Sequence, residues 1–372
     1  ARGAGDVNGD GLADIVVGAF GSDPNGGLSG ESFVVFGRGA GKPVDLSAVS
    51  MGLGAGFAIR GEATSDFSGS AVSGAGDVNG DGLADVIIGA YGLDVEGDTS
   101  GRAYVVFGKT SVTPIELSAV AAGSGGFVID GEGASDQVAG AVSGAGDVNG
   151  DGLADVLVGS ARIDAVGEDS GRAYVVWGKQ DGQAVKLTAV TQGSGGFAID
   201  GQQVRDYAGF TLDAAGDVNG DGLADACGRN AAGIACAPGL VAGGFGPVTQ
   251  WSADFGDATF GGAAYYPSVR LGDIDGDHTA DVCLRGAAGL RCATSNGTAF
   301  TNAHLWSFRS DFSDAAGWGA APGHHDSIRL ADVNGDGLAD ACGRGPDGLV
   351  CGVSNGAGFE AAGLVAPLGF TD

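Results

Sequence analysis

The residues best placed to do chemistry are aspartates in a ten-residue stretch, GDVNGDGLAD, that recurs at 5–14, 76–85, 146–155 and 216–225, and at 331–340 with alanine as its first residue. An altered copy, GDIDGDHTAD, lies at 272–281. We number these six aspartate loops in chain order. Positions 1, 3, 5, 7 and 9 of loop 1 are held by Asp6, Asn8, Asp10, Leu12 and Asp14. Alternating carboxylate, amide and backbone carbonyl oxygens suit Ca²⁺, whereas Mg²⁺ demands a stricter octahedral geometry, so the pattern predicts a calcium site.

The half-pattern D-x-N-x-D-G also opens an EF-hand, which needs a bidentate glutamate at position 12 and flanking helices. Position 12 of the six loops is held by Val17, Ile88, Val158, Gly228, Leu284 and Gly343. Each lies within a strand-like run, so the EF-hand and dockerin interpretations fail. A solvated Asx-rich turn without a metal remains as the alternative. Sixfold repetition of one ligand set weighs against it.

The loops mark a repeat that covers nearly the whole chain. Their first aspartates lie at 6, 77, 147, 217, 273 and 332, at intervals of 71, 70, 70, 56 and 59 residues, and such a period indicates a solenoid, propeller or array. The longer units each hold four short β-branched or aromatic runs between glycine clusters, such as DVIIGA at 85–90. Four antiparallel strands per repeat make one propeller blade. We therefore predict an all-β fold, a β-propeller with six visible repeats, either six-bladed or seven-bladed with one blade missing or divergent.

Two styles of repeat divide the chain at about residue 205. The units in 1–205 carry long acidic connections, and those in 206–372 are shorter and contain cysteine. Because the loop spacing continues across the boundary, we expect one propeller domain over 1–372. The opening ARGAGD matches the second half of GSAVSGAGD at 69–77, so we interpret the start as a truncated repeat.

The six cysteines form three pairs with one spacing, Cys227 with Cys236, Cys283 with Cys292, and Cys342 with Cys351. A repeated separation of nine positions makes a disulfide within each hairpin the most economical pairing. Reduced buried thiols are the alternative, and zinc is disfavoured because no CxxC spacing occurs. Each bridge is expected to replace an apolar cross-strand contact of the earlier repeats. Three disulfides imply an oxidising compartment, so we expect an extracellular, cell-surface or periplasmic protein.

The motif GAGDVNGDGLADVIIGA, followed by GRAYVVFG, resembles the FG-GAP repeat of integrin α-subunit propellers and their bacterial relatives. The shorter DVNGDGLADACGRGPDGLVCGVSNG units resemble VCBS-type repeats, also found in calcium-bearing propeller lectins. The resemblance implies that each loop joins the first two strands of a blade and that about six Ca²⁺ ions bind, one per repeat. The ligands that it implies in loops 1 to 3 are Asp6, Asn8, Asp10, Leu12, Asp14, Asp77, Asn79, Asp81, Leu83, Asp85, Asp147, Asn149, Asp151, Leu153 and Asp155. Those in loops 4 to 6 are Asp217, Asn219, Asp221, Leu223, Asp225, Asp273, Asp275, Asp277, Thr279, Asp281, Asp332, Asn334, Asp336, Leu338 and Asp340.

Loop 5 departs from the pattern at four positions, two of which concern a candidate ligand and the turn itself. Asp275 replaces asparagine, and His278 stands where the other loops have a glycine suited to positive φ. Histidine tolerates that conformation at some cost. We expect loop 5 to bind calcium as the least regular of the six.

The formal charge of −28, with 18 Lys and Arg against 46 Asp and Glu, disfavours nucleic acid and anionic membranes as partners. The sequence contains no apolar run long enough for a membrane span, so no membrane insertion is expected. The common motifs of hydrolases and nucleotide-binding enzymes are also missing, and GHHD at 323–326 is more typical of an exposed turn. We therefore expect no enzyme, with action on polysaccharide as the weaker alternative.

A binding role fits the aromatic residues of the later repeats better. Tyr265, Tyr266 and Trp318 stand beside Asp and Ser, a mixture that can stack on sugar rings and hydrogen-bond hydroxyls, so they are candidate ligand-binding residues. For Trp251 and Trp306, which recur at similar places, packing between blades is the preferred interpretation. We expect a secreted or cell-surface, lectin-like or adhesion module for a protein or carbohydrate ligand. The alternative is a structural module of a larger extracellular complex.

Overall fold

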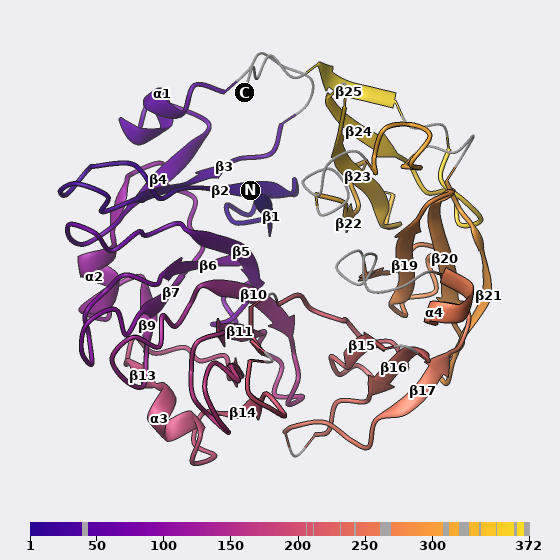
Figure 1. Ribbon diagram of the computed structural model, residues 1–372. Helices are drawn as coiled ribbons and strands as arrows, with labels where there is room; N and C mark the ends of the chain where they lie inside the picture. The colour runs from indigo at the N-terminus through magenta and orange to yellow at the C-terminus, as the bar shows by residue number, and fades with distance from the viewer. Residues whose placement is uncertain are drawn as a thin grey trace. The chain divides into compact units, whose positions relative to one another are not determined.

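The computed structural model describes residues 1–372 except 39–43, 206, 211, 231, 242, 261–268, 308–311, 320–326, 335, 347, 361–362 and 368–372. The chain divides into two compact units, Ala1–Asp213 and Ala214–Asp372. Each unit contains three small sheets built almost entirely of antiparallel strands (Figure 1). Each sheet includes or directly follows one aspartate loop, as the repeat predicts.

The first unit contains blades 1 to 3. Blade 1 consists of β1 (Arg2–Gly5), β2 (Asp14–Ala19), β3 (Glu31–Val35), β4 (Gly56–Arg60) and β8 (Ile115–Glu116). Blade 2 consists of β5 (Ala71–Gly76), β6 (Asp85–Ala90), β7 (Arg102–Val106), β9 (Gly126–Asp130) and β13 (Val185–Lys186). Blade 3 consists of β10 (Ala141–Gly146), β11 (Asp155–Ser160), β12 (Arg172–Val176) and β14 (Gly196–Asp200).

Two features of this unit were not expected from the sequence. β8 and β13 each come from the following repeat and add a parallel two-residue strand to the outer edge of the preceding blade. The connections between third and fourth strands also contain one-turn helices, α1 (Leu46–Ser50), α2 (Leu117–Ala121) and α3 (Leu187–Val190). Asp45 caps α1 by accepting the Ser47 N–H. These strands and helices are too short to show a hydrophobic periodicity, so no sequence pattern predicts them.

The second unit contains blades 4 to 6. Blade 4 consists of β15 (Ala226–Asn230), β16 (Gly233–Ala237) and β17 (Thr249–Ser252), followed by α4 (Asp257–Phe260). Blade 5 consists of β18 (Arg270–Gly272), β19 (Asp281–Gly286), β20 (Gly289–Ser295) and β21 (Phe300–Leu305). Blade 6 consists of β22 (Arg329–Ala331), β23 (Asp340–Gly345), β24 (Gly348–Gly352) and β25 (Gly363–Pro367).

The six sheets are the blades of a six-bladed β-propeller, which confirms the predicted fold class. Five sheets contain at least the four antiparallel strands that the repeats predict. In blade 4, the described residues before loop 4 form no strand, although the Asp225 N–H still donates to the Gly216 carbonyl at 2.8 Å. The predicted four-strand pattern therefore holds for all blades but this one.

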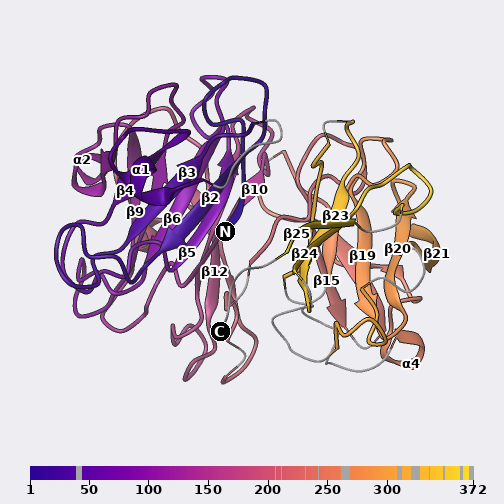
Figure 2. The same ribbon diagram turned by 90° about the horizontal axis from the view of Figure 1, so that it is seen from above.

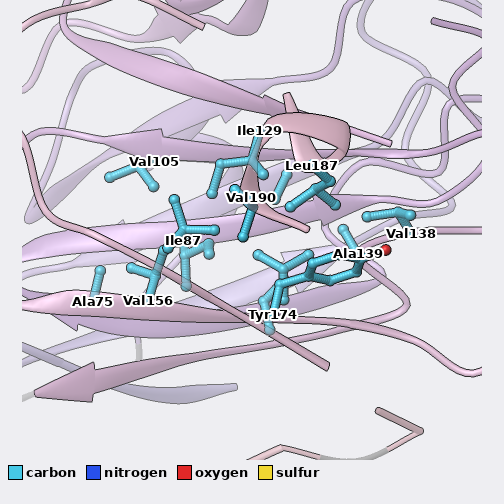
Figure 3. Packing of buried hydrophobic residues seen from close by; sticks show 14 of the residues in the cluster. Ala75, Ile87, Val105, Ile129, Val138, Ala139, Val156, Tyr174, Leu187 and Val190 are labelled. Carbon is cyan, nitrogen blue, oxygen red and sulfur yellow. The ribbon is translucent and has the colours of Figure 1, made fainter. Parts of the chain in front are cut away.

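The core of the first unit lies between its blades. Ile87 and Val105 of blade 2 and Val156 and Leu187 of blade 3 belong to one fully buried cluster (Figure 3). β6 is buried along its whole length, as expected of an apolar inner strand covered on both faces. Close approach explains its glycine, because a Cβ on Gly89 would lie 2.1 Å from the Ala139 carbonyl oxygen.

The second unit uses aromatic side chains for the same purpose. Trp251 contacts Phe300 of the next blade, with ring centroids 5.3 Å apart, and Trp306 contacts Phe359 of blade 6 at 5.6 Å. Both tryptophans are buried. The preference for packing over ligand contact at these two positions is confirmed.

The three predicted disulfides are all present, each within one hairpin and with 4.1 Å between Cα atoms. They join Cys227 with Cys236, Cys283 with Cys292, and Cys342 with Cys351. In blade 5, Cys283 of β19 faces Cys292 of β20. The same register position in blade 2 pairs Ile87 with Val105. The disulfide of blade 5 therefore replaces an apolar cross-strand pair, as the alignment of repeats predicts.

The three disulfides differ in how deeply they are buried. Both cysteines of blade 5 are at most 1% exposed, like the apolar pair that they replace. In blade 6, Cys342 of β23 faces Cys351 of β24 in the same register, and Cys351 is buried while Cys342 is only partly buried. The pairing of Cys351 is thus confirmed, and the bridge of blade 6 stands at the register position of the apolar pair but is less deeply buried than that of blade 5. Cys227 of blade 4 is also only partly buried.

Removing one disulfide tests the equivalence in blade 5. C283A/C292A should lower the free energy of unfolding by about 2–4 kcal/mol, because a local cross-link is lost and two buried positions are emptied. C283I/C292V, which rebuilds the pair found in blade 2, should lose less. Thermal unfolding of both variants without reductant measures the difference, and equal losses would contradict the proposed equivalence.

Candidate metal centres

The aspartate loops occupy one end of the strands in each blade. Loops 1, 2, 3, 5 and 6 join the first two strands of their blades, and loop 4 leads directly into β15. Figure 2 shows the sheets of each unit from a second direction. Each of these five loops connects two antiparallel, hydrogen-bonded strands, so the sheet fixes both ends of the loop. The conformation of the central turn is set by the loop's own side chains.

The position-1 aspartate shapes that turn. In loop 1, Oδ1 of Asp6 accepts the N–H of Gly9 at 2.7 Å, and Oδ2 accepts the N–H of Gly11 at 2.8 Å. Gly11 has φ +86°, which lets the chain fold around the carboxylate. Loop 5 is built in the same way, with the N–H of His278 donating to Asp273 at 2.9 Å and φ +69° at His278. The expected positive φ of His278 is confirmed.

The side chains at positions 3 and 5 are hydrogen-bonded to each other in five loops. In loop 1, Nδ2 of Asn8 donates to Oδ2 of Asp10 at 3.0 Å, while Oδ1 of Asn8 accepts the Asp10 N–H at 2.8 Å. Loops 2, 3, 4 and 6 repeat the amide-to-carboxylate bond at 2.9–3.0 Å. Loop 5 has no equivalent donor, because Asp275 replaces the asparagine.

The position-9 aspartate has a different environment from the other acids. Asp85 is fully buried and accepts two backbone N–H groups, that of Val78 in its own loop and that of Gly108 after the third strand, both at 2.8 Å. All six blades contain this pair of bonds. The loop donors are Val7, Val78, Val148, Val218, Ile274 and Val333, at 2.8–3.0 Å. The donors from the later segment of each blade are Gly37, Gly108, Gly178, Gly239, Ser295 and Ser354, at 2.7–2.8 Å.

We call the position-9 aspartate and its two backbone N–H donors the clamp. Burial has the largest effect on the pKa of its carboxyl group. Desolvation raises the pKa of Asp85, Asp155 and Asp281 to about 7, and the nearby loop carboxylates add to the rise. The two backbone hydrogen bonds oppose it in each case. Burial and neighbouring negative charge therefore disfavour the ionised form of the clamp carboxylate. A neighbouring cation would stabilise that ionised form.

The donor set suits a hard cation. In loop 5, carboxylate oxygens of Asp273, Asp275 and Asp281 lie within 4.8 Å of one another, close enough to share one metal ion. The other loops present the same positions with asparagine in place of Asp275. Carboxylates with an amide oxygen are donors that Ca²⁺ accepts, and Asp6, Asn8, Asp10 and Asp14 with their equivalents are the side chains that would hold it.

The clamp at position 9 is not predicted by the sequence pattern. From the sequence, Asp14 and its equivalents are expected to act only as metal ligands. In the structure, both of their carboxylate oxygens also accept hydrogen bonds from backbone N–H groups. The available signal was the aspartate that begins the second strand in five blades and directly precedes β15 in blade 4, an unusual place for a charge. A polar residue there needs buried partners.

The three candidate ligand-binding aromatics do not form a site among the described residues. Trp318 is only 3% exposed and contacts Phe312, with ring centroids 4.7 Å apart. It offers no open face for stacking on a sugar, so its interpretation as a ligand contact is corrected to core packing. Tyr265 and Tyr266 lie outside the described residues, as does GHHD at 323–326.

Comparisons with known proteins agree with this architecture. Residues 68–106, which contain β5, β6 and β7, match the FG-GAP repeat. A lectin from Agrocybe aegerita, described as specifically recognising non-reducing terminal N-acetylglucosamine, has a similar structure with a TM-score of 0.56 and 22% sequence identity. The similarity covers 97% of this chain and 79% of the lectin. At that identity it shows a shared fold. No curated protein sequence matches the chain.

The clamp predicts different effects at two aspartates of one loop. With metal removed by a chelator, Asp85→Ala should lower the free energy of unfolding by about 2–6 kcal/mol, because two buried N–H groups lose their acceptor. Asp81→Ala, at the exposed position 5, should change it by less than about 1 kcal/mol. Urea unfolding of the metal-free variants measures both. Similar losses would show that position 9 has no separate structural role.

Proposed function

We propose that this chain, a β-propeller with an FG-GAP repeat, is a calcium-stabilised binding module for a carbohydrate ligand, exported to an oxidising compartment. The observation that carries the proposal is the sixfold aspartate loop, which gathers oxygen donors at the same place in each blade. The propeller supplies the frame, and the differences between repeats supply the ligand surface.

Calcium explains why so much negative charge is concentrated in the loops. In loop 2, Asp77 and Asp81 both raise the pKa of the buried Asp85, so the metal-free loop holds its acids against their mutual repulsion. One divalent ion per loop would offset that repulsion and link position 1 to position 9. Calcium binding to the folded state alone would then stabilise every blade.

A carbohydrate ligand is supported by the Agrocybe aegerita lectin, which has the same fold and is described as recognising terminal N-acetylglucosamine. Tyr265 and Tyr266 remain the candidate contacts from sequence. Among the described residues, carboxylate oxygens from three acids come within 4.8 Å of one another at Asp273, Asp275 and Asp281 of loop 5, which suits metal binding better than glycoside cleavage.

The disulfides support the proposed compartment. All three cysteine pairs are bonded, including Cys342 with Cys351 near the end of the described chain, a state typical of secreted, cell-surface and periplasmic proteins. Among the described residues, none of the helices has the length and apolarity that crossing a bilayer requires.

A protein ligand is the second candidate, favoured by acidic connections at the opposite end of the strands. The segment 91–101 between β6 and β7 exposes Asp94, Glu96 and Asp98, and the segment 161–171 between β11 and β12 exposes Asp164 and Glu168. Clustered exposed acids of this kind suit a basic partner surface.

Calcium removal should destabilise the protein. Saturating EDTA should lower the thermal unfolding midpoint, and excess Ca²⁺ should restore it, because each site contributes about 2.7 kcal/mol at a hundredfold excess over Kd. Mg²⁺ should restore less, since it needs a regular octahedral site. Differential scanning calorimetry makes the comparison. An identical midpoint with and without chelator would overturn calcium as a structural ion.

A glycan array tests the carbohydrate ligand. The calcium-loaded chain should bind glycans that end in N-acetylglucosamine or a related sugar, and EDTA should reduce the signal. A chain first stripped and then reloaded with Ca²⁺ controls for irreversible unfolding. Failure of the reloaded chain to bind any glycan would contradict the carbohydrate proposal and favour the protein-ligand alternative.

A further inference from the structure

Consecutive aspartate loops within each unit touch one another. The alanine at position 8 of one loop donates its N–H to the carbonyl oxygen of the position-1 aspartate in the preceding loop. In the first unit, Ala84 donates to Asp6 and Ala154 to Asp77, both at 2.9 Å. In the second unit, Ala280 donates to Asp217 and Ala339 to Asp273, both at 2.7 Å. The aspartate that shapes one loop is thus held by the next.

Side-chain packing reinforces each contact. A Cβ built on Gly5 would lie 2.7 Å from Cβ of Ala84, and one on Gly9 would lie 2.9 Å from a methyl carbon of Leu83. The same close approaches occur between loops 2 and 3, where Ala154 meets Gly76 and Leu153 meets Gly80. Glycine is needed at these places because the neighbouring loop fills the space. A shift in one loop must therefore be accommodated by its neighbour.

The second unit adds a buried serine between successive loops. The Ser295 N–H donates to Oδ1 of Asp281 in loop 5 at 2.7 Å, while its hydroxyl donates to the Val218 carbonyl in loop 4 at 2.5 Å. Ser354 repeats the connection between loops 6 and 5. Its N–H donates to Asp340 at 2.8 Å, and its hydroxyl donates to the Ile274 carbonyl at 2.6 Å. Both serines are at most 5% exposed, and each connects a candidate ligand of one site to the backbone of another.

We propose that calcium binding is cooperative between neighbouring loops of a unit, and that Ser295 and Ser354 transmit the coupling in the second unit. This inference rests on the proposed calcium function. An ion that fixes Asp281 also fixes the Ser295 N–H that this carboxylate accepts, and the Ser295 hydroxyl then holds loop 4 at Val218. Binding at loop 5 therefore reduces the conformational freedom that loop 4 loses when its own ion binds, which is the condition for positive cooperativity.

The site-resolved experiment is a calcium titration of the full chain followed by NMR at the position-6 amides. Gly222 reports on loop 4 and Gly337 on loop 6, because each N–H donates to the position-1 carboxylate of its loop. Gly82 of loop 2 serves as the control in the other unit. Loop 5 is disabled by Asp273→Asn with Asp277→Asn. The calcium concentration at the titration midpoint should rise about fivefold or more for the Gly222 and Gly337 amides. The midpoint for the Gly82 amide should stay unchanged.

The serine variants assign the route. In a chain carrying Ser295→Ala and Ser354→Ala, disabling loop 5 should shift the Gly222 and Gly337 midpoints by less than half as much as in the native chain. Ser307→Ala is the matched control, since this buried serine accepts the Leu290 N–H within blade 5 and so supports a strand instead of an aspartate loop. It should preserve the full shift. The serine variants keep every loop acid, so they also test the coupling if the loop-5 variant fails to fold. In that case the calcium titration curves at Gly222 and Gly337 should be less steep in the serine variants than in the native chain.

The outcomes separate the two proposals. Unchanged midpoints at Gly222 and Gly337 after loss of loop 5 would leave calcium binding intact and overturn the coupling. An equal shift at Gly82 would also overturn it, because the effect would then be a general loss of stability. If the native chain shows no calcium-dependent change at any of these amides, the proposed calcium function fails, and the coupling fails with it.

Discussion

Each blade depends on one buried carboxylate that holds three pieces of chain together. The position-9 aspartate accepts one N–H from its own loop and another from a later segment of the blade, as Asp155 does with Val148 and Gly178. The bonds close the end of the blade, but they place a charge where water is excluded. Burial raises the pKa of this group, so the ionised carboxylate carries an electrostatic cost that a neighbouring cation would offset.

The rest of the loop follows from that requirement. The acids at positions 1 and 5 are too exposed to serve as core, and they increase rather than relieve the electrostatic repulsion at position 9. A cation among them would offset that repulsion, and the same oxygens would then be its ligands. We therefore propose that the six loops are the frame of the propeller and that the ligand surface belongs to segments that differ between repeats.

Much of this architecture was predictable from local spacing, but contacts between distant segments were not. The repeated cysteine spacing identified the partners of Cys236 and Cys351 correctly, and the correspondence of Ile87 with Cys283 follows from their equal distance to an aspartate loop. By contrast, Gly108 lies 23 residues from Asp85, and no motif marks its backbone N–H as a donor. β8 and β13, which each join the blade of the preceding repeat, are too short for any sequence pattern to predict.

The most direct test of this account is the number of calcium ions that the native chain retains. Equilibrium dialysis against buffered Ca²⁺, with bound metal measured by atomic emission, should give about six ions per chain, one for each loop of oxygen donors. The double variant Asp6→Asn with Asp10→Asn should lose one ion. A native chain that retains no calcium above the dialysis buffer would contradict the claim that the loops are metal centres.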